Sequence, residues 1–184
     1  MKILVISYSL TGNNEALATG ISAAYEAKHI KVREATPRAM GTIFFDILFN
    51  RTPQVTIPDN AEYYDWVIFV GPVWMGHVAT PFRAYFKRMK GMPGKYAYVS
   101  ISGGADGANP KLAGELNKRM GKEPAALIDL HIADILPAEP KPERKDTMAY
   151  RLNESDVKRL TDKIVKTLRE TVANAYSSPV LQSY

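Results

Sequence analysis

The sequence contains no cysteine among its 184 residues. It can therefore form no disulfide bond, no thiolate metal site and no cysteine nucleophile. A chain without disulfides suits a reducing compartment, so we expect a cytoplasmic protein. At this length one hydrophobic core can stabilise the fold without covalent links, and residues 1–184 are predicted to form a single domain.

Long apolar segments are also lacking. No run approaches the ~20 residues that span a bilayer, and the apolar run at residues 3–6 is too short for the core of a signal peptide, so we expect no membrane insertion. The formal net charge is only +5, and the lysines and arginines are spread along the chain. Since no nucleic-acid-binding signature is present, we predict a solvated basic surface and no nucleic-acid partner.

Two common nucleotide signatures do not occur in the sequence. The pattern G-x-x-x-x-G-K-[ST], whose lysine binds the extra charge of a triphosphate, is absent, and so is the dinucleotide pattern G-x-G-x-x-G. The chain is therefore not expected to bind a nucleotide in either of these ways.

Short apolar runs rich in β-branched and aromatic residues are present, and they predict strands at residues 2–8, 65–70, 96–101 and 125–132. The first two runs are apolar almost throughout, which indicates strands covered on both faces, as in a parallel sheet. Residues 30–34 alternate between apolar and polar and predict a more exposed edge strand.

Between these strands, apolar residues spaced by threes and fours predict helices at about residues 17–25, 82–89, 110–120 and 155–175, with Gly121 ending the third. Alternating strands and helices indicate βαβ units, and hence an α/β protein with a doubly wound parallel sheet.

Two segments do not fit this alternation. Residues 36–60 contain an apolar stretch that predicts a helix packed on the core or on a partner, whereas the proline- and charge-rich residues 136–146 predict a surface loop.

The first loop, residues 9–14, reads Ser-Leu-Thr-Gly-Asn-Asn and lies between a predicted strand and a predicted helix. Unpaired N–H groups at a helix start, together with the helix dipole, can bind an anion there. Ser9, Thr11 and the amide of Asn13 or Asn14 could add hydrogen bonds. Since the loop has no lysine or arginine, a monophosphate held by neutral donors fits it best.

Two more loops are expected at the same edge of the sheet, at residues 71–77 (Gly-Pro-Val-Trp-Met-Gly-His) and 102–107 (Ser-Gly-Gly-Ala-Asp-Gly). Glycine and proline let the backbone approach a flat ligand, and Trp74 offers a large face for an aromatic ring. A phosphate site and a ring site at one edge together indicate flavin mononucleotide (FMN).

These motifs, Ser-x-Thr-Gly-Asn after the first strand and Gly-Pro-x-Trp-x-Gly after the third, resemble those of flavodoxins and flavodoxin-like oxidoreductases. The resemblance spans nearly the whole chain. It implies a three-layer doubly wound sandwich whose five-stranded parallel sheet has the order 2-1-3-4-5, with FMN bound where the strand order reverses.

The same resemblance implies which residues bind the cofactor. The first loop would bind the phosphate, Trp74 would cover one ring face, and the loop at 103–107 would contact the pyrimidine edge. The implied FMN-binding residues are Ser9, Leu10, Thr11, Gly12, Asn13, Asn14, Pro72, Val73, Trp74, Met75, Gly76, His77, Ser102, Gly103, Gly104, Asp106 and Gly107.

Two departures from the flavodoxin pattern bear on function. Electron-carrier flavodoxins are strongly acidic, whereas Asp106 is the only carboxylate in the three loops. Flavodoxins also usually cover the outer flavin face with a tyrosine after strand four, and residues 102–109 contain no aromatic residue. An open outer face could admit a substrate.

Some of these residues also have an ordinary structural interpretation. His77 is expected to be incidental, because the sequence shows no carboxylate partner for it. Asp106 could accept a hydrogen bond from the flavin or cap a turn. The phenylalanines at 44–49 suggest core packing or a dimer face rather than a substrate wall.

We expect an FMN-dependent electron carrier that exchanges electrons with redox partner proteins, with no residue acting as acid or nucleophile. The alternative is an NAD(P)H-dependent reductase of quinones or nitro compounds that uses the open flavin face. The sequence leaves open whether the protein is a monomer or a homodimer.

Overall fold

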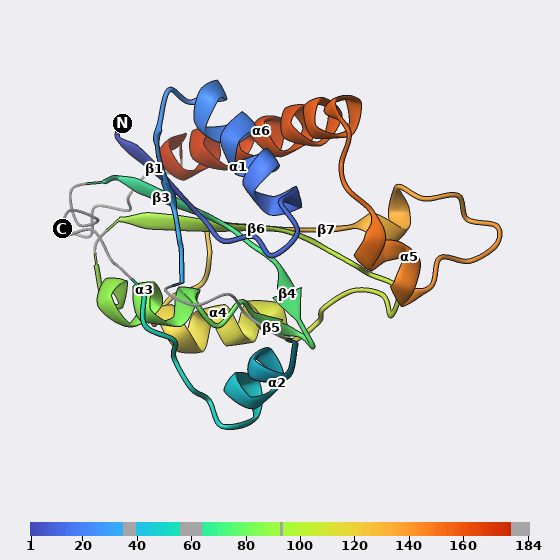
Figure 1. Cartoon of the computed structure of the whole chain (residues 1–184). Coiled ribbons are helices and arrows are strands. Elements are labelled where there is room, and N and C mark those ends of the chain that lie inside the picture. Colours follow the sequence, from blue (N-terminus) through green and yellow to red (C-terminus); the bar gives the residue numbers. More distant parts are fainter. Residues whose placement is uncertain (35–39, 56–63, 93, 178–184) are drawn as a thin grey trace, which may run out of the picture.

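The computed structural model describes residues 1–34, 40–55, 64–92 and 94–177. Its centre is a five-stranded parallel sheet (Figure 1). Across the sheet the strands follow the order β2 (Lys28–Lys31), β1 (Ile3–Ser7), β3 (Trp66–Val70), β6 (Lys95–Ser102) and β7 (Ala126–His131). The predicted α/β fold with a five-stranded parallel sheet is confirmed.

Strands β1 and β3 are buried along their whole length, as their continuous apolar runs predict. Successive side chains of a strand point to opposite faces, so β1 contributes to two separate hydrophobic clusters. Leu4 and Ile6 pack in one cluster, and Ile3 and Val5 pack in the other. The edge strand β2 lies two residues earlier than predicted, because its register is set by pairing with β1.

Helices cover both faces of the sheet and make three layers (Figure 1). Helices α1 (Asn13–Ala24) and α6 (Glu154–Ser177) lie on one face, and α3 (Phe82–Met89) and α4 (Leu112–Met120) lie on the other. All four were predicted from their apolar spacing, and α4 ends at Gly121 as expected. None of the helices in the described ranges is long and apolar enough to cross a membrane.

A short antiparallel hairpin, β4 (Val73–Trp74) and β5 (His77–Val78), follows β3. Its two turn residues, Met75 and Gly76, both have positive φ angles, of 52° and 78°, as a two-residue turn that matches the twist of its strands requires. Nothing in the sequence spacing predicts this hairpin. The observed order of the sheet is β2-β1-β3-β6-β7, where the expected order was 2-1-3-4-5. The two labels differ because the hairpin adds two strands, β4 and β5, before β6.

Helix α2 (Met40–Leu48) lies within the segment where a helix was predicted, of which residues 36–39 and 56–60 are outside the described part. Its Ile43 is buried, whereas the phenylalanines do not pack in the core, so of their two expected roles the dimer face stays a prediction. The helix contacts the rest of the protein along one side only. The side chains of Phe44, Phe45, Leu48 and Phe49 are exposed.

A surface loop was predicted for residues 136–146, but residues 144–146 belong to helix α5 (Arg144–Ala149), so the prediction is wrong for the last part of this segment. Glu143 and Asp146 form a reciprocal capping box that satisfies backbone N–H groups at the start of this helix. A single turn of 3-10 helix, η2 (Ile132–Asp134), precedes the loop. In Figure 1, α5 lies at the end of the molecule where the loop after β6 also turns.

Candidate functional site

The loop between β1 and α1 lies at the carboxyl edge of the sheet, where the sequence analysis places a phosphate site. Helix α1 begins at Asn13, so its first backbone N–H groups have no partner within the helix. Before it, the Gly12 N–H donates to Ser9 Oγ at 3.0 Å, which closes the loop into a tight turn. The side chains of Leu10 and Thr11 are not buried, so this loop is open to solvent.

The side-chain amides of Asn13 and Asn14 form hydrogen bonds with distant parts of the backbone. Both polar atoms of the Asn14 side chain bond the Ile101 peptide at the end of β6: Nδ2 donates to the carbonyl oxygen at 2.9 Å, and Oδ1 accepts from the N–H at 3.0 Å. Asn13 bonds the Tyr150 carbonyl and the Leu152 N–H in the same way, at 3.1 and 3.0 Å. These bonds engage both side-chain amides within the protein, so the backbone and two hydroxyls are the main donors left in the loop, and the predicted phosphate contact from Asn13 and Asn14 stays a prediction.

These hydrogen bonds also bring the site together. The Asn14 side chain fixes the first loop to the end of β6, next to the loop that starts at Ser102. The Asn13 side chain fixes the same loop to the chain that follows α5. Three segments far apart in the sequence thereby meet at one end of the sheet.

Two tyrosines, Tyr98 and Tyr8, contact the hairpin that carries Trp74 and the residues just before it. The Tyr98 hydroxyl lies 3.1 Å from the Gly71 carbonyl oxygen and 3.2 Å from that of Pro72, and burial raises the pKa of Tyr98 well above its usual value. It therefore remains a protonated donor. The Tyr8 ring meets the Trp74 ring edge to face, with centroids 5.7 Å apart and an interplanar angle of 88°. Trp74 is half-buried, held on one side and open on the other.

Trp74 and the loop after β6 line one hollow of about 520 Å³, which we call the ring cavity. Its volume is in the range of ligand sites. Nine of the predicted residues line it: Val73, Trp74, Met75, Gly76, Ser102, Gly103, Gly104, Asp106 and Gly107. Ser9, Leu10, Thr11, Gly12, Asn13, Asn14, Pro72 and His77 do not line it, although the first six lie in the adjoining loop.

The outer wall of the ring cavity is formed by helices α5 and α2, which the sequence did not associate with the site. From α5 come Arg144, Thr147 and Met148, and from α2 come Ile43 and Phe44. The spacing of Glu143 and Asp146 was the available signal for a helix start here.

Helix α5 is attached to the loop after β6 at two points. Arg144 donates from Nε and Nη2 to Asp106 Oδ2, at 3.0 and 2.8 Å. Thr147 is buried against Gly103, where an added Cβ would come within 2.9 Å of its hydroxyl oxygen. Gly104 has a φ of +74°, and any side chain there would clash with His131. Asp106 therefore acts through an ion pair, which neither predicted role included.

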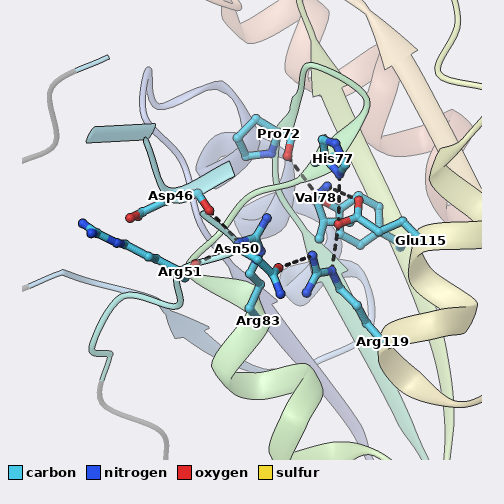
Figure 2. A network of polar contacts seen from close by, with 10 residues as sticks. Asp46, Asn50, Arg51, Pro72, His77, Val78, Arg83, Glu115 and Arg119 are labelled. Atoms are coloured by element: carbon cyan, nitrogen blue, oxygen red, sulfur yellow. Dashed lines mark hydrogen bonds and ion pairs between the residues drawn. The ribbon is translucent and has the colours of Figure 1, made fainter. Parts of the chain in front are cut away.

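His77 does not line the ring cavity. Its Nδ1 lies 3.3 Å from Oε1 of Glu115 on helix α4, and it lines a separate hollow between α3 and α4 (Figure 2). The expectation that His77 has no carboxylate partner is wrong, whereas its contact with a cofactor stays a prediction.

No protein-family model matches the sequence, and no curated protein matches it significantly. Solved structures do share its fold. A flavoprotein from Lactobacillus acidophilus, determined in complex with FMN, matches with a TM-score of 0.60 and 22% identity over 70% of this chain and 92% of its own.

Two further structures come from Bacteroides uniformis and Bacteroides eggerthii, both assigned as flavoproteins. Their TM-scores are 0.62 and 0.59 at 14% and 17% identity, and the matches cover 79% and 80% of this chain and 94% of each of theirs. At such identities the likeness shows the fold alone. The chain has a flavodoxin-like fold.

Proposed function

We propose that the protein binds FMN and carries electrons between redox partner proteins. The observation that carries the proposal is the bridge from Asn14 to the Ile101 peptide, because it joins the phosphate loop to the ring cavity. A flavin ring in that cavity would have its phosphate chain directed toward the start of α1. The match to a flavoprotein that binds FMN supports the same ligand.

The phosphate would be held by neutral donors. The first N–H groups of α1 and the hydroxyls of Ser9 and Thr11 are the donors that the structure leaves to the ligand, since the amides of Asn13 and Asn14 are bonded elsewhere. The helix dipole adds a partial positive charge at this end. Such a site suits one phosphate group, as in FMN, better than a di- or triphosphate.

The ring would stack on Trp74 and meet the backbone of the loop after β6 at its polar edge. When bound, FMN supplies reversible one- and two-electron chemistry, and the protein tunes it by stacking, hydrogen bonding and charge. Arg144 and Asp106 stand at this edge as an ion pair. None of the chain's own residues is required to take up or release a proton in an electron carrier.

The second candidate is an NAD(P)H-dependent reductase of quinones or nitro compounds. It is favoured by the outer wall of the ring cavity, where Met148 and Phe44 are largely exposed and no aromatic ring of the loop after β6 covers the ligand. A substrate ring could stack on the flavin from that side. The basic surface would also attract the anionic nucleotide.

The first experiment is an absorbance spectrum of the purified protein with added FMN, followed by stepwise anaerobic reduction. If dithionite produces a stable blue one-electron-reduced flavin and NAD(P)H has no effect, the electron carrier is supported. Rapid bleaching by NAD(P)H, with turnover of a quinone, would replace it by the reductase. Failure to bind FMN would contradict both.

A matched pair of variants tests the phosphate loop. Thr11→Val removes a hydroxyl of the loop and is expected to weaken FMN binding roughly tenfold, which corresponds to about one hydrogen bond to a charged group. Riboflavin, which has no phosphate, should bind equally well before and after the change. The control, Thr19→Val, removes an exposed hydroxyl on helix α1, which follows the loop, and should alter neither affinity. Equal FMN affinities for all three proteins would show that the loop does not bind the phosphate.

A further inference from the structure

A second hollow, of about 570 Å³, lies between helices α3 and α4 and is bordered by His77 of the hairpin. We call it the basic groove. Five basic side chains line it against a single carboxylate, that of Glu115. The basic residues are Arg83, Lys87, Lys90, Lys118 and Arg119.

Two of the five have structural roles (Figure 2). Arg83 is buried and donates from Nη1 to the carbonyl oxygens of Asp46 and Arg51 at 2.9 and 2.8 Å, which fixes the end of helix α2. Arg119 Nε donates to Glu115 Oε1 at 2.7 Å. The other Glu115 oxygen accepts the Val78 N–H at 2.8 Å. The only carboxylate of the groove is therefore already engaged, and it anchors α4 to the hairpin.

The three lysines are different. Lys87 on α3, Lys90 directly after α3 and Lys118 on α4 are exposed, and within the described residues none of them forms an ion pair. Exposed lysines act as mobile point charges, which favour long-range attraction of a large anionic surface over tight binding of one small ion.

The position of the groove connects it to the proposed electron transfer. His77 and Val78 of the hairpin border it, while Trp74, Met75 and Gly76 of the same hairpin line the ring cavity. Helix α2 lies beside both hollows, with Ile47 at the groove and Phe44 at the cavity. Phe44 and Phe45 of this helix are exposed and add apolar surface. A protein seated on the groove would therefore reach the exposed hairpin tip.

We infer that the basic groove docks an acidic electron-carrier protein, whose redox centre exchanges electrons with FMN through the hairpin tip. Interfaces of this kind join complementary charges around a small apolar contact, and the lysines and α2 provide both. This inference rests on the proposed function, and it reverses the charge arrangement of acidic flavodoxins, whose negative surface attracts basic partners.

The test uses an acidic plant-type ferredoxin as the probe and basic cytochrome c as the opposite probe. Binding to the FMN-loaded protein is measured by calorimetry at several salt concentrations, and electron exchange by stopped-flow absorbance. We expect ferredoxin binding to weaken as salt rises, because exposed charges are screened. The variant K87E/K90E/K118E should weaken it roughly tenfold or more.

A control variant carries the same change in net charge elsewhere. K28E/K163E/K166E reverses three exposed lysines on the edge strand β2 and on α6, which covers the opposite face of the sheet from α3 and α4, and should leave ferredoxin binding within about twofold. Cytochrome c should bind the groove variant better than the native protein.

Three outcomes would overturn the inference. The first is that the native protein does not bind ferredoxin. The second is that the groove variant and the control variant weaken ferredoxin binding equally. The third is that the groove variant abolishes binding of inorganic pyrophosphate but still binds ferredoxin. FMN affinity and far-ultraviolet circular dichroism are measured for every variant. A protein that binds FMN but not ferredoxin contradicts the docking surface alone, whereas loss of FMN binding in the native protein contradicts the proposed function.

Discussion

Asn14 bridges helix α1 and the end of strand β6 through two hydrogen bonds to one buried peptide. Replacing it by alanine leaves the Ile101 N–H and carbonyl without these partners. Because each unsatisfied buried group is costly, Asn14→Ala should lower the free energy of unfolding by about 2 kcal/mol or more. Urea denaturation measures this. Thr19→Ala, on the exposed side of helix α1, is the control and should change the free energy of unfolding by less than about 0.5 kcal/mol. Similar changes for Asn14→Ala and Thr19→Ala would show that the bridge is not a major source of stability.

His29 gives the fold a dependence on pH. Its Nε2 lies 2.7 Å from Ser7 Oγ, and its pKa is lowered by burial first and by the Lys31 charge second, against a smaller opposite effect of Glu15. The unfolded chain therefore binds more protons than the native state as the pH falls. This contribution to stability is complete above the unfolded pKa of about 6.5 and is lost as the pH decreases toward the folded value.

We therefore expect the stability of the native protein to decrease between pH ~7.5 and pH ~5.5, and His29→Gln to show a shallower decrease. Glutamine can still bond Ser7 but does not titrate. Urea midpoints across this interval give the two slopes. Identical slopes would mean that His29 does not contribute.

Helix α5 has a larger role in the site than its six residues suggest, because it closes the outer side of the ring cavity. Arg144 places a positive charge there, and a cation favours the more negative, reduced form of a bound flavin. Arg144→Gln should therefore make the FMN reduction potential more negative. The ion pair with Asp106 is exposed, so stability should change little.

Lys145→Gln is the matched control for this change. Lys145 lies on the same helix and pairs with Glu143, but it does not line the ring cavity. Spectroelectrochemical titration of the three FMN-loaded proteins compares their potentials. If both variants shift the potential equally, the effect is one of net charge and not of the position of Arg144.

The whole molecule is a sheet covered by two helical layers, and the proposed ligand site lies at the edge where three loops meet (Figure 1). A ligand that binds only this assembled edge stabilises all three layers. At a free concentration of about 100 times Kd, FMN should add about 2.7 kcal/mol, which raises the melting temperature of a chain of this length by roughly 5–10 °C.

Thermal melts followed by circular dichroism test this expectation. Riboflavin at the same concentration lacks the phosphate contacts and should raise the melting temperature less. An equal rise with riboflavin and FMN would place the binding energy in the ring cavity alone, and no rise with either would contradict FMN binding.

The order of strands and helices could be predicted from the sequence because it depends on local periodicity. The apolar runs of β1 and β3 and the spaced apolar residues of α1, α3, α4 and α6 specify each element within its own stretch of chain. The glycine-rich loop after β6 and Trp74 were likewise recognised from neighbouring residues, and the structure places them on one cavity.

The use of individual polar side chains could not be predicted in this way. Asn14 has its partner 87 residues away, and Arg144 has its partner Asp106 38 residues away. His77 and Glu115 also come from different elements. Which loop amide faces a ligand, and which helix closes the cavity, depends on how distant segments pack, and no local pattern in the sequence encodes that packing.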